Sequence, residues 1–70
     1  MTLNTRAGAI LRQMRQSAGM TLADVGNALP DMGLSRAQLS LLERGRQEWG
    51  LHRIEALCAL YGAEPREVLQ

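Results

Sequence analysis

Apolar residues along this 70-residue chain recur at steps of three and four rather than two, which is the spacing of one face of an α-helix. Glycines and prolines separate these apolar groups into short segments, because proline lacks an amide donor and glycine permits a sharp reversal. The pattern predicts an all-α, compact fold of five short helices, at about residues 5–18, 22–29, 36–44, 51–61 and 66–69.

Only side-chain packing is available to hold these helices together. The sequence has one cysteine, Cys58, and one histidine, His52, so neither a disulfide nor a zinc site can form within one chain. A domain this small buries only about 60% of the surface that its unfolded chain exposes, so an oligomer would gain stability. We therefore expect residues 1–70 to form a single domain without a metal or cofactor.

The chain carries no sign of a membrane segment. No stretch approaches the roughly 18 apolar residues that span a bilayer, and the N-terminus lacks the apolar core of a signal peptide. We expect a cytoplasmic protein.

The first and fourth expected helices have clear apolar faces. The first carries a narrow stripe formed by Ala7, Ile10, Leu11, Met14 and Ala18. Its N-cap is expected at Asn4 or Thr5, and Gly19 should end it. The fourth has apolar residues over nearly half its circumference, namely Leu51, Ile54, Leu57, Cys58, Leu60 and Tyr61.

The two middle helices are marked by their caps. Thr21 is the expected N-cap of the second helix, with Asp24 three residues further on, where a carboxylate stabilises the first turn. Pro30 and Gly33 should end this helix. Ser35 is the expected N-cap of the third.

The third helix has two sides of different character. Leu39 and Leu42 lie on one side, and the opposite side carries Arg36, Ala37, Ser40, Leu41 and Arg44. Such a mixture suits the major groove of DNA, where arginine donates twice to guanine and alanine or leucine contacts a thymine methyl group. An ordinary solvated face would also look like this, and periodicity alone leaves both interpretations open.

Positive charge is concentrated in two parts of the chain. All eight basic residues are arginine, and seven acids leave a net charge of only +1. Residues 1–18 and 36–53 are net positive, whereas residues 19–35 and 54–70 are net negative. Binding to DNA would therefore require Arg36, Arg44 and Arg46, joined by Arg12 or Arg53, to share one face.

Three segments together resemble the phage-repressor and Cro type of helix-turn-helix proteins, the XRE family. They are Leu11-Arg12-Gln13-Met14-Arg15, Gly19-Met20-Thr21 and Leu39-Ser40-Leu41-Leu42-Glu43-Arg44-Gly45-Arg46. The resemblance covers roughly residues 8–69 and implies a helix-turn-helix at about residues 21–44, whose second helix enters the major groove.

The resemblance also implies roles for single residues. Base edges would be contacted by Arg36, Ala37, Ser40 and Leu41, and phosphates by Thr21, Arg44, Arg46 and Gln47. Arg15 and Glu43 would form a structural ion pair that orients the third helix. Helical projection is compatible with this pair, because Arg15 lies beside Leu11 and Glu43 beside Leu39.

The sequence departs from the family pattern at three places. Leu22 stands where a glutamine is usual, so this side chain cannot brace the backbone by hydrogen bonding. Residues 30–32 are additional and lengthen the turn, which leaves the tilt of the third helix open. Trp49 stands near the place of a loop proline, and it would either close the core or a dimer seam, or donate its indole N–H to a phosphate beside Arg46.

These features favour a sequence-specific transcription regulator, most simply a small dimeric repressor that binds double-stranded DNA at an inverted repeat. Tyr61, Val68 and Leu69 are the expected homodimer interface. The alternative is an antitoxin-like or adaptor protein, in which the same fold mainly binds a protein partner. An enzyme is not expected, because the chain offers no nucleophile with a base and no metal-ligand set.

Overall fold

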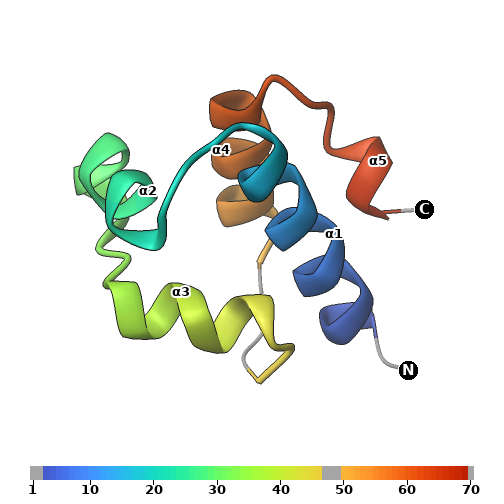
Figure 1. Cartoon of the computed structure of the whole chain (residues 1–70). Helices are drawn as coiled ribbons and strands as arrows, with labels where there is room; N and C mark the ends of the chain where they lie inside the picture. Colours follow the sequence, from blue (N-terminus) through green and yellow to red (C-terminus); the bar gives the residue numbers. More distant parts are fainter. Residues whose placement is uncertain (1–2, 47–49, 70) are drawn as a thin grey trace.

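In the computed structural model, the residues described are 3–46 and 50–69, without the side chains of Leu3, Asn4 and Leu69. Figure 1 shows their elements in chain order: α1 (Leu3–Ser17), α2 (Leu22–Ala28), the short 3-10 turn η1 (Pro30–Met32), α3 (Arg36–Glu43), α4 (Leu51–Tyr61) and α5 (Arg66–Leu69). The described residues contain five α-helices and no strand, which confirms the all-α fold predicted from the sequence.

The first helix differs from the prediction at both ends. It begins at Leu3, so Asn4 and Thr5 lie inside the helix and neither is its N-cap. At the other end, Gly19 adopts a φ of 71° and the N–H of Met20 donates to the carbonyl oxygen of Arg15 at 3.2 Å. This closing turn, which favours glycine, ends the helix at Ser17. Ala18 therefore lies beyond the helix and is exposed, outside the buried stripe.

The second helix begins as its sequence predicts. The hydroxyl of Thr21 accepts from the N–H of Asp24 at 3.1 Å, and the carboxylate of Asp24 accepts from the N–H of Thr21 at 2.9 Å. These two bonds form a capping box, which satisfies donors that a helix start leaves free.

The additional residues before α3 form a single tight turn. Pro30–Met32 make the 3-10 turn η1, in which the N–H of Met32 donates to the carbonyl oxygen of Leu29 at 3.2 Å. Gly33 then reverses the chain with a φ of 63°, and Ser35 caps α3 by accepting from the N–H of Gln38 at 3.1 Å. The insertion is thus ordered by its own hydrogen bonds, and α3 starts where the sequence predicts.

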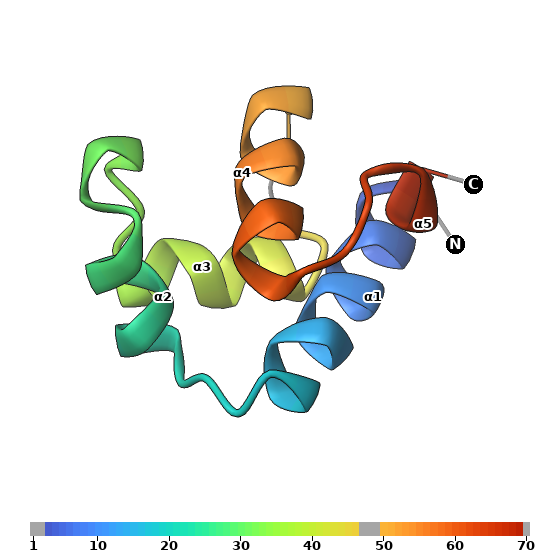
Figure 2. The ribbon, with the colours of Figure 1, turned by 90° about the horizontal axis from the view of Figure 1, so that it is seen from above.

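A single apolar cluster joins the five helices. In both views, α1, α3 and α4 surround its centre, with α2 on one side and α5 against α1 (Figures 1 and 2). The buried apolar residues are Ala7, Leu11, Val25, Leu34, Leu39, Leu42, Ile54, Leu57, Cys58 and Val68.

Two predictions about the burial of side chains are wrong. Leu51, expected on the buried face of α4, is 58% exposed because it occupies the first position of that helix. Val68, expected at a dimer interface, is 0% exposed because α5 folds back against α1 and turns this side chain into the core. Val68 therefore stabilises one chain and offers no surface to a second.

Candidate nucleic-acid interface

The outer side of α3 forms one continuous surface. Four of its side chains line a shallow open hollow together with Leu22 of α2 and the C-cap residue Arg44, and they are Arg36, Ala37, Ser40 and Leu41. Arg36, Ala37 and Arg44 are exposed, whereas Ser40 and Leu41 are half-buried. In Figure 1, α3 lies along one edge of the described helices. The structure therefore brings the four residues predicted to contact bases onto one exposed surface.

The inner side of α3 is fixed by an ion pair with α1. The Nε of Arg15 donates to one carboxylate oxygen of Glu43 at 2.7 Å, and its Nη2 donates to the other at 3.1 Å. The side chains are only 12% and 6% exposed, respectively. The hydrogen bond to Glu43 raises the pKa of the Arg15 guanidinium. The pair is therefore a two-point, largely desolvated contact, the kind that fixes orientation as well as distance.

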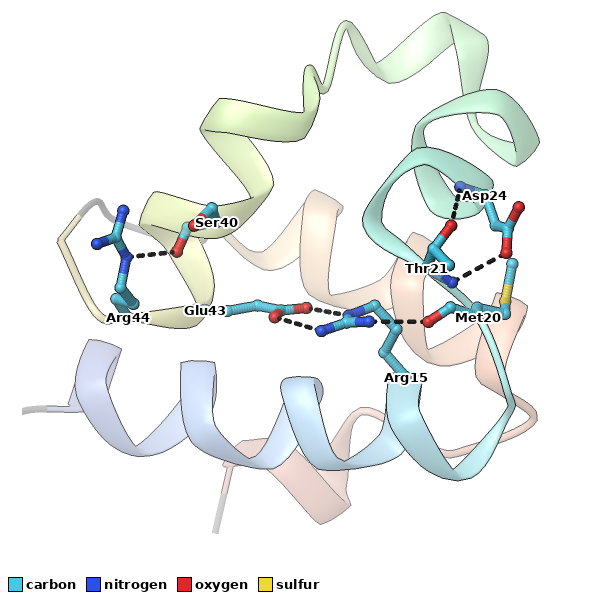
Figure 3. Close-up of polar contacts among 7 residues, drawn as sticks. All are labelled: Arg15, Met20, Thr21, Asp24, Ser40, Glu43 and Arg44. Carbon is cyan, nitrogen blue, oxygen red and sulfur yellow. Dashed lines mark hydrogen bonds and ion pairs between the residues drawn. The ribbon is translucent and has the colours of Figure 1, made fainter.

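Arg15 also holds the loop that precedes α2. Its Nη1 donates to the carbonyl oxygen of Met20 at 2.8 Å, next to the N-cap Thr21 (Figure 3). One guanidinium thus connects α1, the start of α2 and the end of α3. The relative placement of these elements decides how α2 and α3 are oriented on the surface.

A glycine in α1 sets the distance between α1 and α3. A Cβ added at Gly8 would lie 2.6 Å from the carbonyl oxygens of both Leu42 and Glu43, which are backbone atoms at the end of α3. Only glycine allows the two helices to approach this closely. This role was not predicted from the sequence, although a glycine inside a strongly helical segment often marks such a contact.

The end of α3 presents cationic side chains. The Nε of Arg44 donates to the backbone carbonyl oxygen of Ser40 at 3.3 Å, which leaves its two terminal nitrogens available (Figure 3). Arg46, two residues further on, is exposed. Gln47, predicted to contact a phosphate, and Trp49, predicted either to close the core or a dimer seam or to bind a phosphate, lie outside the described residues.

Arg12 of α1 extends this cationic surface. It lines a second hollow with Leu22, Ser40 and Arg44, on the side of α3 next to α1. Arg12 is exposed, and the described residues provide it with no ion-pair partner. Of the two arginines suggested from the sequence as additional members, Arg12 is thus placed beside Arg44.

The start of α2 is partly occupied by its own capping box. Because the N–H of Thr21 already donates to Asp24, it is not free for a phosphate. Hydrogen bonds from the backbone N–H and from the side chain of Thr21 lower the pKa of the Asp24 carboxyl, so this residue stays ionised. The N–H groups of Leu22 and Ala23 remain for a phosphate, because a helix start leaves them without intrahelical partners.

Another hollow, lined by no charged side chain, lies on the side of α1 away from Gly8. It is lined by Ile10, Gln13, Met14, Ser17, Ala18 and Tyr61. Burial raises the pKa of the Tyr61 phenol to about 12, with Glu43 contributing. Tyr61 is half-buried here, whereas the side chain of Leu69, also predicted at a dimer interface, is not described.

The described residues hold no group of three or more histidine, cysteine or acidic side chains that could bind a metal ion. They also include no helix that is both long and apolar enough to cross a membrane. The exposed cations and the mixed face of α3 are the chemistry that this part of the chain offers.

The fold and this face define a helix-turn-helix domain of the DNA-binding kind. The chain belongs to the family described as "Helix-turn-helix domain", whose model matches residues 6–70, and such domains are common in regulators of the XRE type. No curated protein and no solved structure gives a match. The helix-turn-helix resemblance inferred from the sequence is thereby confirmed at the level of this domain family.

Proposed function

We propose that the protein is a sequence-specific transcription regulator, acting as a small dimeric repressor on an inverted-repeat operator in the cytoplasm, associated with the nucleoid when bound to DNA. The observation that carries this proposal is the single surface shared by Arg36, Ala37, Ser40, Leu41 and Arg44. Its chemistry matches a major-groove edge, since it combines guanidinium, hydroxyl and apolar groups within one helix face.

We assign two roles within this surface. Arg36, at the first position of α3, would donate to a guanine, and Ser40 and Leu41 follow one turn later on the same side. Arg44 and Arg12 border that row. Together with Arg46 and the free N–H groups at the start of α2, they would bind phosphates. The phosphate contacts would then fix the register of the protein on the duplex, and α3 would supply the sequence specificity.

Random-pool selection of DNA with the purified protein, followed by measurement of Kd, tests this proposal. We expect a symmetric motif, and Arg36→Ala should relax preference at one base pair by about 1 to 3 kcal/mol. Arg44→Ala should weaken all sequences alike and reduce the salt slope by about one unit. Arg66→Ala, which removes an exposed arginine on α5, is the matched control. Failure to enrich any motif, or identical effects of the first two variants, would refute the assignment.

The homodimer is proposed because one α3 reads too few base pairs to find a site among genomic competitors. With Val68 in the core, the hollow formed by Ile10, Met14 and Tyr61 is the surface that we assign to the second chain. Sedimentation should show dimers that dissociate in a Tyr61→Glu variant. If the wild type remains monomeric at high concentration and with DNA present, the dimer is excluded.

The same hollow favours the alternative function, in which the fold binds a different protein. An adaptor or antitoxin would bind a partner through Ile10, Met14 and Tyr61 and bind DNA weakly. The Arg36→Ala variant distinguishes the two functions. A repressor would lose function in this variant because it loses sequence preference, whereas an adaptor or antitoxin would still bind its protein partner.

A further inference from the structure

Leu22 is the one side chain shared by three adjoining hollows on the face that we assign to DNA. The first contains Arg36, Ala37 and Leu41, the second contains Thr21 and Arg36, and the third contains Arg12 and Arg44. It is an apolar residue at the centre of a surface whose rim is cationic.

The position of Leu22 follows from the capping box. Thr21 and Asp24 fix the first turn of α2, and Leu22 is its first residue. Its side chain packs against the edge of the core but remains only half-buried. The part that the core does not cover lies at the hollow in front of α3, beside the apolar side chains of Ala37 and Leu41.

The surroundings indicate what this apolar surface would accept. The exposed guanidinium groups of Arg12, Arg36 and Arg44 around it favour a polyanion, so an apolar peptide is a poor occupant. In the major groove of a duplex, the apolar group on the base edges is the C5 methyl of a pyrimidine. Thymine carries this methyl group, whereas uracil and unmodified cytosine do not.

We propose that Leu22 is a specificity residue and that, with Ala37 and Leu41, it forms an apolar seat for the C5 methyl group of a pyrimidine. This inference rests on the proposed DNA-binding function and adds a chemical discrimination to it. The protein distinguishes thymine from uracil at the base position that this apolar seat contacts. If a cytosine occupies that position, a methyl group on its C5 atom strengthens binding.

The first part of the test uses chemically modified DNA with the wild-type protein. In the half-site recovered by selection, each thymine is replaced in turn by deoxyuridine and each cytosine by 5-methyl-deoxycytidine, and Kd is measured for the wild-type protein. We expect loss of the methyl group at one thymine to weaken binding about three- to fivefold, the effect of one buried methyl group. Where the seated base is cytosine, methylation should strengthen binding by a similar factor.

Two protein variants assign the effect to Leu22. Leu22→Ala should reduce the ratio of Kd values for the methylated and unmethylated base towards one. Leu51→Ala, which shortens an exposed leucine at the start of α4, should leave that ratio unchanged. Because each ratio compares two DNA molecules with the same protein, a small loss of folded protein in Leu22→Ala does not affect it.

The outcomes separate this inference from the proposed function. Sequence-specific binding in which no pyrimidine methyl group matters, or in which the methyl effect is the same in Leu22→Ala, overturns the inference and leaves the regulator in place. Absence of sequence-specific binding to any DNA overturns both.

Discussion

Replacement of Gly8 by alanine sets two effects of opposite sign against each other. Alanine is about 1 kcal/mol better than glycine in the interior of a helix, so propensity alone predicts a more stable α1. The added Cβ, however, would lie 2.6 Å from two backbone oxygens at the end of α3. Overpacking of this kind costs about 3 kcal/mol when the neighbouring atoms cannot move aside. We expect Gly8→Ala to lower the free energy of unfolding by about 2 kcal/mol.

The assay is thermal unfolding combined with DNA binding. In a domain of this size, a loss of about 2 kcal/mol corresponds to a fall of roughly 8 to 16 °C in Tm. DNA affinity should also fall at temperatures where the variant is fully folded, because relief of the contact displaces α3 from α1. A protein that binds DNA normally and melts no lower than the wild type would refute the argument.

Gly26→Ala is the matched control, since Gly26 also lies inside a helix. A Cβ there would meet one atom, the carbonyl oxygen of Leu34, at 3.1 Å. A shift of a few tenths of an ångström relieves that contact. The gain in helix propensity and the smaller strain should then nearly cancel.

Three further predictions concern the polar contacts and the buried phenol. Arg15→Ala should cost about 3 to 5 kcal/mol, because it leaves Glu43 buried without its partner, and Arg15→Lys should cost less but still weaken DNA binding, as urea unfolding and Kd measurements would show. Thr21→Ala should lower the free energy of unfolding by about 1 kcal/mol. Ionised Asp24 stabilises the fold near neutral pH, and this stability is lost as the pH falls through its lowered pKa. The contribution of Asp24 should be smaller in the Thr21→Ala variant. The phenol of Tyr61 should ionise near pH 12 rather than 10 by absorbance, and stability should fall by about 1 kcal/mol across that interval, because the unfolded chain releases this proton first. A normal tyrosine titration would contradict the burial of this side chain.

Features set by neighbouring residues could be predicted from the sequence. The order of the helices, the caps at Thr21 and Ser35 and the start of α3 depend on side chains within three or four positions, which one sequence displays directly. The grouping of Arg36 with Ser40 and Leu41 likewise follows from the helical repeat alone.

Features set by the crossing of helices could not be predicted in this way. The role of Gly8 depends on how closely α3 approaches, and the burial of Val68 depends on the direction in which the chain turns after α4. Both Leu51 and Val68 are apolar residues near helix ends, and only the packed structure shows which of them enters the core.

The charge of the candidate interface has to be counted locally, because a net charge of +1 is the sum of groups in very different situations. Glu43 is neutralised by Arg15, and the Asp24 carboxylate accepts a backbone N–H at the start of α2. Arg12, Arg36 and Arg44, by contrast, are exposed and form no ion pair among the described residues. A phosphate approaching this face therefore meets unpaired cations, while Glu43 and Asp24 are already engaged by Arg15 and by the N–H of Thr21. Since counterion release depends on the charges that contact the phosphates, a nearly neutral chain can bind DNA with a steep dependence on salt.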